Sequence, residues 1–466
     1  MAAVSDEATA AAIAKLEADG AASATIATFA GQLERLAAGD LGMLPESGLE
    51  PVTELPDAES LEVDGGAIAA LLDQTVVIKL NGGLGTSMGL AGPKSLLEVK
   101  DGLTFLDITA RQIEALRNEH GGARLPLVLL DSFRTREPSL AALASYGPLS
   151  GDLPPDFLQG RVPKLVDDGS FAPVAWAADP ELEWSPPGHG DVYPALVGSG
   201  MLEQMLAAGY RYAFVANADN LGAVLDPAIL CWIAAEQAPF VMEVADRTAA
   251  DRKGGHLARR ADGTLVLREI AQTPDQDLEA FANTERHRYF NTNSIWLDLQ
   301  ALSAALGDDG VIDLPMIVNR KNVDPSDPNS TPVVQLESAI GAAIAAIPGA
   351  RAIRVPRSRF LPVKTTDDLL VLRSDAYELG ADGQLALAAT CAGRAPLVEL
   401  DGDHFRLIDE FERHFAQGAP SLVAAERLTV KGDVSFGLGV SVSGAVTVEA
   451  TAGESLQVED GATLSG

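Results

Sequence analysis

Cysteines, aromatic residues and long apolar runs are scarce in this chain, and each scarcity excludes a class of protein. Only Cys231 and Cys391 occur among 466 residues, which excludes a disulfide framework or a cysteine-rich metal site, and both are expected to be buried thiols. No segment offers roughly 18 consecutive apolar residues, so no transmembrane helix is predicted. The first residues, MAAVSDEATA, lack the basic and apolar regions of a secretory signal, so we expect a cytoplasmic protein.

Basic residues are also scarce. The chain has 34 Lys and Arg against 66 Asp and Glu, for a formal net charge of −32. This balance argues against nucleic acid or an anionic membrane surface as a partner, because both require a basic face. Solubility alone is a sufficient explanation of the general acidity.

Acids are missing, however, from two windows, residues 74–97 and 338–366. An acidic protein that keeps two segments free of carboxylates is expected to bind an anion there. The basic residues of these windows are Lys79, Lys94, Arg351, Arg354, Arg357, Arg359 and Lys364. The arginines of the RVPRSR stretch are equally compatible with pairing to surrounding acids, so they are left out of the catalytic set.

Apolar runs alternate with helical stretches from about residue 75, which predicts an α/β domain with a mostly parallel sheet. Ligands of such sheets bind at the carboxyl ends of the strands. Two polar segments follow predicted strands, a glycine-rich loop and an Asn-Ala-Asp-Asn run, so we expect them to face one crevice. The strand runs are TVVIKL, RLPLVLLDS, YRYAFVANADN and APFVMEVADR, and the helical stretches include residues 104–117 and 198–208.

Both ends of the chain have patterns of their own. Residues 1–65 are predicted to form a helical extension and connector, because Ile26, Phe29, Leu33 and Leu36 recur at helical spacing before a Pro- and Glu-rich segment. Near the C-terminus two apolar series recur every six residues, which is typical of a parallel β-helix, with an irregular β meander as the alternative. These series are Leu428, Val434, Val440, Val446 and Val430, Phe436, Val442, Val448.

The glycine-rich loop KLNGGLGTSMGLAGPKS, residues 79–95, has the composition of a phosphate-binding loop. A P-loop is disfavoured, because Pro93 precedes the lysine and has no N–H to donate. A dinucleotide fingerprint is disfavoured, because a strand and turn follow the loop where that motif requires a helix. A purely structural turn remains possible, but a long loop over a nucleoside triphosphate suits the glycines, which permit close backbone approach, and Lys94, which reaches a phosphate.

The loop resembles the signature loop of the eukaryotic-type UTP–glucose-1-phosphate uridylyltransferases. Seven further segments resemble that family in the same order, so the similarity covers about residues 75–450. These are FLQGRVPKL, PPGHGDVY, FVANADNLGA, LREIAQTP, YFNTNSIW, VVQLESAIGAAI and VPRSRFLPVKTTDDLL. The resemblance implies a glycosyltransferase-A-like nucleotidyltransferase domain over residues 66–385 with a mixed, mostly parallel sheet, and a C-terminal left-handed parallel β-helix over 386–466.

The reaction that the resemblance implies converts UTP and glucose 1-phosphate reversibly into UDP-glucose and pyrophosphate. The sugar phosphate attacks the UTP α-phosphorus in line. It is already an anion near neutral pH, because a phosphate monoester has a second pKa of about 6, so the site needs cations and alignment more than a general base. Lys94 matches the loop lysine that holds the triphosphate, and Lys364 matches the lysine that stabilises the α-phosphate; its alternative is an ordinary surface lysine.

The resemblance also implies the other site residues. Asp219 is expected to hold Mg²⁺, with a helix N-cap as the alternative role. The remaining UTP contacts are expected from Leu80, Asn81, Gly82, Gly83, Gln159 and Gly188, and the sugar-phosphate contacts from His189, Asn217, Glu269 and Asn293. The chain ends short of the strand on which octameric family members assemble, so a monomer or a small homo-oligomer formed through the β-helix is expected.

Two other functions compete with this one. A relative acting on N-acetylglucosamine or galactose 1-phosphate is disfavoured, because N-acetylhexosamine members carry an arginine in the loop where Ser87 and Met88 follow Thr86 here. A non-catalytic scaffold or sugar-nucleotide sensor is disfavoured because Lys94, Asp219 and Lys364 are all present.

Overall fold

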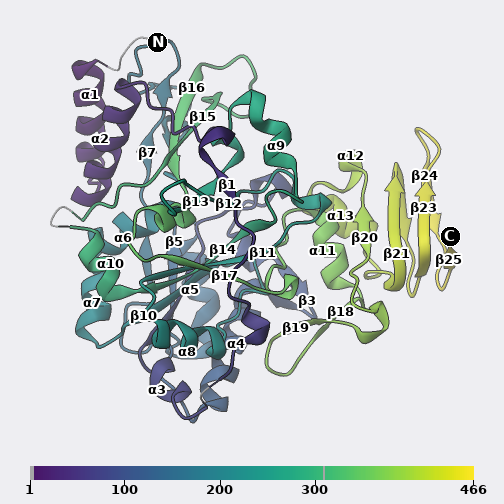
Figure 1. Cartoon of the computed structure of the whole chain (residues 1–466). Helices are drawn as coiled ribbons and strands as arrows, with labels where there is room; N and C mark the ends of the chain where they lie inside the picture. Colours follow the sequence, from purple (N-terminus) through teal and green to yellow (C-terminus); the bar gives the residue numbers. More distant parts are fainter. Residues whose placement is uncertain (1–4, 64, 308–309) are drawn as a thin grey trace.

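A large α/β body carries a narrow stack of strands at one end (Figure 1). The computed structural model describes residues 5–63, 65–307 and 310–466. No helix within these ranges is both long enough and apolar enough to cross a membrane.

A ten-stranded mixed sheet forms the centre of the body, in the order β1-β12-β14-β10-β2-β5-β6, with β13 paired to β12, β11 to β14 and β17 to β11. β10, β2, β5 and β6 run parallel to one another, whereas β14 runs antiparallel to β10 and β11. The predicted mixed α/β core is therefore present. The strands are β1 Glu50–Pro51, β2 Thr75–Leu80, β5 Leu127–Asp131, β6 Asp156–Leu158, β10 Tyr212–Asn217, β11 Phe240–Asp246, β12 His256–Arg259, β13 Leu265–Arg268, β14 Tyr289–Asp298 and β17 Arg351–Arg354.

Helices cover both faces of this sheet, because its central strands are apolar on both sides. Val76 and Ile78 of β2 pack with α6, α7 and α10, whereas Val77 packs on the opposite face with α3, α4 and α8. A strand buried on both faces reads as a continuous apolar run, which is why TVVIKL is recognisable in the sequence. The helices are α3 Ile68–Leu72, α4 Phe105–Glu119, α5 Arg136–Leu143, α6 Val192–Gly198, α7 Met201–Ala207, α8 Pro227–Glu236, α9 Leu278–Ala282 and α10 Leu299–Ala305.

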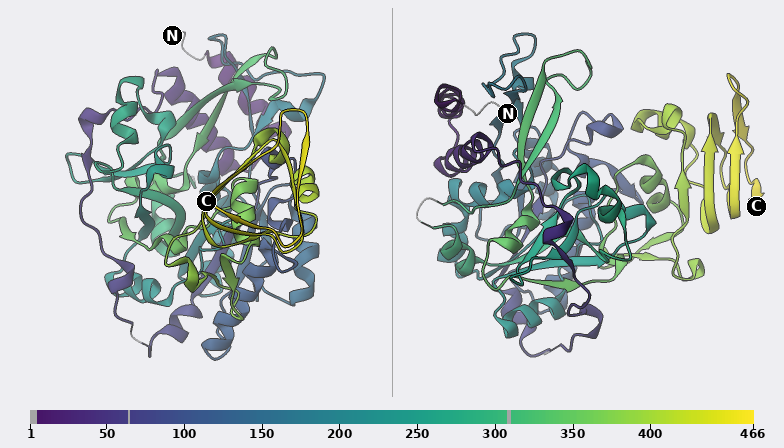
Figure 2. Two further views of the ribbon diagram at one scale, coloured as in Figure 1. Left: turned by 90° about the vertical axis from the view of Figure 1, so that its right-hand side faces the viewer. Right: turned by 45° about the horizontal axis from the view of Figure 1, so that its top comes forward.

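The N-terminal helices α1 (Asp6–Ala18) and α2 (Ser23–Ala37) form an antiparallel pair on the body (Figures 1 and 2). Phe29, Leu33 and Leu36 of α2 are buried against a small sheet, as their helical spacing predicts. The small sheets of the body are β15 Met316–Asn322, β16 Pro332–Ser338 and β8 Leu165–Val166; β7 Val162–Pro163 and β9 Trp184–Ser185; and β3 Glu98–Lys100 with β4 Leu103–Thr104.

The C-terminal unit is a stack of parallel strands, and in end view its yellow strands trace a triangle (Figure 2, left). Leu428 pairs with Val446 and Val430 with Val448, so both six-residue series lie in register and point into one core. Helices α11 Thr366–Arg373, α12 Gly402–Phe405 and α13 Ile408–His414 join it to the body. β18 Tyr377–Leu379 and β19 Leu385–Leu387 form a separate antiparallel pair before the stack. The strands of the stack are β20 Leu397–Glu399, β21 Ser421–Lys431, β22 Asp433–Phe436, β23 Ser441–Glu449, β24 Ser455–Val458 and β25 Thr463–Ser465.

Candidate active site

Two polar loops meet where the parallel strands β2 and β10 end. Leu80, the last residue of β2, pairs with Asn217, the last residue of β10, so the segments that follow them leave the sheet together. They line a cavity of about 340 Å³. Its walls are Leu80, Asn81, Gly82, Gly83, Lys94, Ser95, Gln159, Pro186, Gly188, His189, Asn217, Ala218 and Asp219. The shared crevice that the sequence predicts is thus formed, and we call this space the nucleotide cavity.

A second cavity of about 490 Å³ adjoins the first and is called the sugar cavity here. It contains Lys364 together with Glu269 and Asn293. The two cavities share His189, Asn217 and Asp219. Every residue expected to bind substrate therefore lines one cavity or the other, although seven separate segments of the chain supply them.

The glycines of the loop allow two close approaches. A Cβ atom on Gly82 would lie 2.2 Å from Oε1 of Gln159, so only glycine leaves that amide in place. Gly85 has a φ of 60°, and the chain then returns so that the Lys94 N–H donates to the carbonyl of Gly83 at 3.1 Å. The loop therefore closes on itself and presents Lys94 to the same cavity as Gly83.

The Asn81 side chain points away from the cavity. Its Nδ2 donates to Oδ1 of Asp131 at 2.7 Å and to Oγ of Ser139 at 2.8 Å, both buried. Burial raises the pKa of Asp131 to about 6, against the effect of these hydrogen bonds. Asn81 thus anchors the loop through its side chain, and the residue lines the cavity with its remaining atoms.

His189 holds a fixed tautomer at the junction of the cavities. Its Nδ1 accepts a hydrogen bond from the Ile340 N–H at 2.8 Å, so the proton of the neutral ring lies on Nε2. Burial lowers the pKa of His189 to about 4. The ring is therefore a neutral hydrogen-bond donor at physiological pH, rather than a cation or a base.

A buried carboxyl group ties two of the substrate loops together. Oδ2 of Asp191 accepts a hydrogen bond from the Gly160 N–H at 2.5 Å, which joins the segment of His189 to that of Gln159. Burial raises the pKa of Asp191 to about 6. Asp191 therefore holds His189, at the junction of the cavities, at a fixed distance from Gln159 in the wall of the nucleotide cavity.

A bulge of β14 brings Asn293 into the sugar cavity. Met242 and Val244 of β11 pair with Ile295 and Asn291, so three residues of β14 stand opposite one of β11. Asn293 takes a φ of 59°, a conformation that asparagine tolerates better than most residues. Its Oδ1 accepts from Nδ2 of Asn291 at 2.6 Å.

Glu269 lies on the opposite wall, close to the Gly254–Gly255 turn. A Cβ on Gly255 would come within 2.4 Å of its carboxylate. Burial raises the pKa of Glu269, and the charge of Lys364 opposes that shift. The carboxyl group therefore has the surroundings of a hydrogen-bond partner for an uncharged polar group, such as a sugar hydroxyl.

Lys364 is exposed and precedes α11. Its backbone N–H donates to Oδ2 of Asp368 at 2.7 Å, within the capping box of that helix, and its Nζ lies 5.6 Å from the ring centroid of Phe360. Its ammonium makes no ion pair among the described residues. Lys364 therefore keeps a free positive charge at the edge of the sugar cavity.

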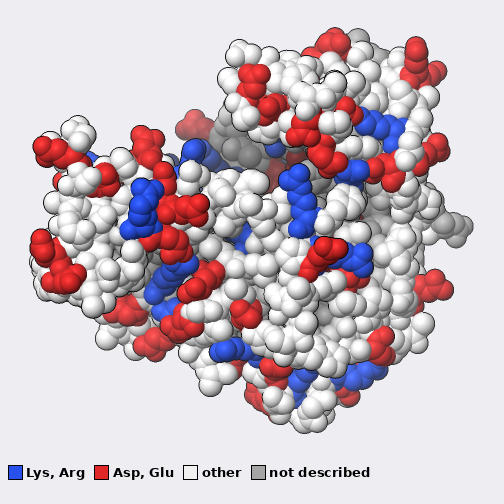
Figure 3. All heavy atoms as spheres, turned by 180° about the vertical axis from the view of Figure 1, so that it is seen from behind, with Lys and Arg blue, Asp and Glu red and all other residues white. Residues whose placement is uncertain are grey.

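The anion-binding interpretation of the acid-free windows is wrong for most of their basic residues. The four arginines of the second window pair with acids that lie outside it: Arg351 with Glu236, Arg354 with Asp57, Glu59 and Asp246, Arg357 with Asp251, and Arg359 with Glu243. Lys79 is buried, donates to the Ala223 carbonyl at 2.8 Å, and has its pKa lowered to about 7, chiefly by burial. Figure 3 shows the same mixture on one face, where blue side chains lie beside red ones.

Sequence reasoning missed several residues of the cavities. Lys253 and Asp251 line the sugar cavity from the loop between β11 and β12, and Glu337 lines it from β16. The DRKGG stretch around Lys253 had one usable signal, a basic residue followed by two glycines. Glu337 lies within the family-like segment VVQLESAIGAAI but had no local signal of its own, because an acid in a strand is indistinguishable from a solvent-facing residue.

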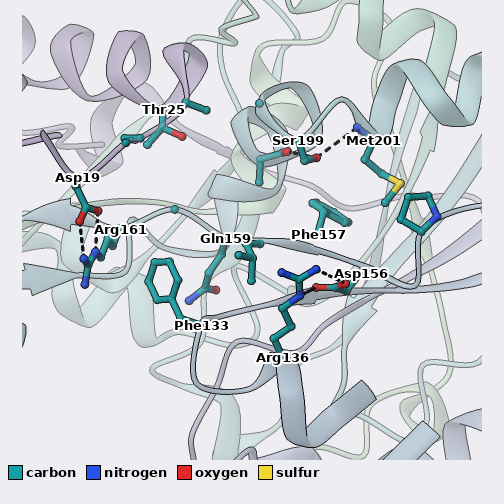
Figure 4. A pocket seen from close by; sticks show the side chains of 18 of the residues that line it. Asp19, Thr25, Phe133, Arg136, Asp156, Phe157, Gln159, Arg161, Ser199 and Met201 are labelled. Atoms are coloured by element: carbon teal, nitrogen blue, oxygen red, sulfur yellow. Dashed lines mark hydrogen bonds and ion pairs between the residues drawn. The ribbon is translucent and has the colours of Figure 1, made fainter. Parts of the chain in front are cut away.

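A third cavity, of about 420 Å³, also has Gln159 in its wall (Figure 4). Its walls include Phe133, the ion pair of Arg136 with Asp156, and that of Arg161 with Asp19. Gln159 is the one residue that it shares with the nucleotide cavity. The amide of Gln159 thus forms a partition between the two spaces.

The model of the family described as UTP–glucose-1-phosphate uridylyltransferase matches residues 40–443. The chain belongs to this family. A member from Solanum tuberosum is 42% identical over 425 residues, which are 91% of this chain and 85% of the relative. A probable member from Schizosaccharomyces pombe is 38% identical over 413 residues, 88% of this chain and 80% of the relative. The resemblance inferred from the motifs is confirmed.

Solved structures agree with this assignment over nearly the whole chain. UDP-glucose pyrophosphorylase from Leishmania major, known in open and closed structures, is 43% identical with a TM-score of 0.92 and covers 99% of this chain and 98% of its own. A mutant of that enzyme in complex with UDP-glucose has the same identity, TM-score and coverage. A structure named UDP-glucose phosphorylase from Trypanosoma brucei is 45% identical, with a TM-score of 0.89 and coverage of 99% and 98%.

Proposed function

We propose that this family member transfers a uridylyl group from UTP to glucose 1-phosphate, forming UDP-glucose and pyrophosphate in a reversible reaction. The observation that carries the proposal is the junction of the nucleotide and sugar cavities at His189, Asn217 and Asp219. One cavity has Lys94 in its wall and the other has Lys364. UTP in one cavity and glucose 1-phosphate in the other would meet between these lysines, where the uridylyl transfer has to occur.

The chemistry assigned to the chain is alignment and charge stabilisation. The attacking phosphate is an anion already, so the neutral His189 is not needed as a base and its Nε2–H is free to donate to a phosphate oxygen. Lys94 is assigned to the triphosphate and Lys364 to the charge that develops on the α-phosphate. The backbone of Leu80, Asn81, Gly82 and Gly83, with Gln159 and Gly188, is assigned to the uridine side. Asn217, Glu269 and Asn293 are assigned to the sugar.

Magnesium is part of the proposal, with Asp219 as its protein ligand. Oδ2 of Asp219 is held by Lys94, whereas no hydrogen bond to Oδ1 is found among the described residues. Mg²⁺ in such sites is usually bound by one or two carboxylates together with waters and substrate phosphates. A single free carboxylate oxygen fits that coordination. When bound, the ion would offset the negative charge of the phosphates.

Glucose 1-phosphate is preferred as the sugar substrate over N-acetylglucosamine or galactose 1-phosphate. The named relatives are UTP–glucose-1-phosphate uridylyltransferases, and a solved neighbour holds UDP-glucose. The test is pyrophosphate release from UTP with Mg²⁺ and each sugar 1-phosphate in turn. Release that is fastest with glucose 1-phosphate is expected. No release with any sugar would refute the enzymatic function, and preference for another sugar would refute only the substrate.

The C-terminal unit is proposed to be a left-handed parallel β-helix, supported by its parallel pairing and in-register apolar series. The division at residues 65 and 385 into an extension, a catalytic domain and this unit is part of the same proposal. A cytoplasmic location and a monomer or small oligomer formed through the β-helix remain predictions.

A further inference from the structure

We propose that His404, His414 and Asp433 form a binding site for a divalent transition-metal ion, such as Zn²⁺, at the base of the C-terminal strand stack. His404 belongs to α12, His414 ends α13, and Asp433 begins β22. The site lies outside both substrate cavities and requires no part of the proposed reaction.

The three donor groups converge on one point. One ligand atom from each residue lies within 4.8 Å of the other two. Nδ1 of His414 is 3.6 Å from Oδ1 of Asp433, and the two imidazole rings meet edge-on with centroids 6.3 Å apart. Tetrahedral ligands at about 2.1 Å from zinc lie roughly 3.4 Å from each other. The ligand atoms would therefore have to move closer by up to about 1.4 Å, which rotation of the His404 side chain can supply.

His404 is the residue that has the freedom to make this movement. Its ring is partly exposed and makes no hydrogen bond or ion pair among the described residues; its ring contact is with His414. His414 is 5% exposed and packs on the ring of Phe405, with centroids 4.6 Å apart. One histidine is thus fixed by packing and the other is available to close on the ion.

The backbone around the site is held in place by other groups. Asp401 caps α12, accepting from the Asp403 N–H at 3.0 Å, and its other oxygen accepts from the Gly432 N–H at 2.8 Å. The helix that carries His404 is thereby fastened to the residue before Asp433. Oδ2 of Asp433 accepts from Oγ of Ser455 at 2.7 Å, which orients the carboxylate and leaves Oδ1 toward His414. Such outer hydrogen bonds are typical of groups that orient metal ligands.

The donor set selects the class of metal. Two imidazoles and one carboxylate suit zinc and related transition ions, whereas Mg²⁺ prefers oxygen ligands. An ion at this point would cross-link α12, α13 and β22. It would therefore stabilise the attachment of the stack to the body.

The competing explanation is that His414 Nδ1 only hydrogen-bonds Ser435 Oγ, 3.2 Å away, and pairs with Asp433, and it does not involve His404. The two explanations are separated by titrating EDTA-treated full-length protein with Zn²⁺ in a calorimeter and following the melting temperature in parallel. His404→Ala is the test variant, and His120→Ala, which removes a histidine at the end of α4, is the matched control. Circular dichroism checks that both variants fold.

The wild type and His120→Ala are expected to bind one Zn²⁺ and to melt at a higher temperature with it. His404→Ala is expected to bind at least about a hundredfold more weakly, because a direct ligand is lost. Co²⁺ should give visible bands of tetrahedral intensity in the wild type and not in His404→Ala. Equal Zn²⁺ binding by His404→Ala, or no binding by the wild type, would overturn the proposal. Pyrophosphate release with Mg²⁺ should be similar in all three proteins, so failure here is distinguishable from failure of the proposed function.

Discussion

Nζ of Lys94 lies 2.5 Å from Oδ2 of Asp219 across the nucleotide cavity. The lysine comes from the loop after β2 and the aspartate from the segment after β10. The site therefore brings the proposed triphosphate-binding cation and the proposed metal ligand into direct contact. A nucleotide that arrives with its metal offers each of them a new partner, so this ion pair is expected to loosen when substrate binds.

Replacement of Asp219 tests its role toward Mg²⁺. Asp219→Asn keeps the shape but loses the negative charge, so the Mg²⁺ concentration for half-maximal rate should rise by about tenfold or more. The measurement is initial rate against Mg²⁺ at saturating substrates. Asp275→Asn, at an exposed acid outside both cavities, is the control. A Mg²⁺ dependence like that of the control would remove Asp219 from the metal site.

Lys364→Ala is expected to reduce kcat by a factor on the order of 10²–10³, comparable to the loss of one preorganised donor to a transition-state charge. The melting temperature should hardly change, because the side chain is exposed and forms no ion pair among the described residues. Lys321→Ala, an exposed lysine of β15, should leave kcat unaltered. Near-normal turnover of Lys364→Ala would refute the assignment.

Gly82→Ala tests the close approach of the loop to Gln159. The new Cβ would have to displace the Gln159 amide, 2.2 Å away, so KM for UTP should increase by about tenfold while the fold persists, because a flexible side chain can move aside. Gly92→Ala in the same loop meets nothing within 4 Å and serves as the control. Steady-state kinetics with varied UTP decide between them, and equal KM values for both variants would contradict the partition role of Gln159.

Asp131→Asn is expected to stabilise the protein at neutral pH. The folded pKa of about 6 exceeds the ordinary value of 3.8, so the stability that this carboxyl contributes is complete only below about pH 4 and is lost as the pH rises through 6. The neutral amide avoids that loss. Urea unfolding at pH 7.5 should show a gain of about 1–3 kcal/mol.

The same variant measured at pH 4.5 supplies the control for Asp131. Its advantage over the wild type should shrink there, because the wild-type carboxyl then carries a proton in the fold as well. An advantage that is unchanged between pH 7.5 and pH 4.5 would show that charge burial is not its cause.

Local patterns predicted the strands around the site well, and the reason is burial. β2, β5, β10 and β11 coincide with apolar runs, and the polar residues that end β2 and β10 mark the crevice. The family resemblance then assigned residues such as Glu269 and Asn293, which no local pattern distinguishes. Their placement depends on a bulge and a glycine turn that arise only from strand pairing.

Charge was the least predictable property. Arg354 and Asp57 are almost 300 residues apart in the chain, and their pairing is visible only in the fold. The acid-free windows were therefore misleading about Lys79 and the arginines, whereas Lys94 and Lys364 do line the two substrate cavities. Composition gives the number of charged residues in a segment. Whether those residues are free to bind a ligand depends on which acids from distant parts of the chain pack against them.

Met88 has a consequence for how the molecule responds to its ligands. This loop residue is buried in the same hydrophobic cluster as Phe405 and Leu428, and a Cβ on the adjacent Gly89 would lie 3.1 Å from Leu407. The segment over the nucleotide cavity thus rests on the C-terminal unit as well as on β2. Binding and folding are linked in one thermodynamic cycle. A nucleotide that orders this loop must therefore also stabilise the strand stack against unfolding. Conversely, a substitution that destabilises the stack must weaken the affinity for the nucleotide.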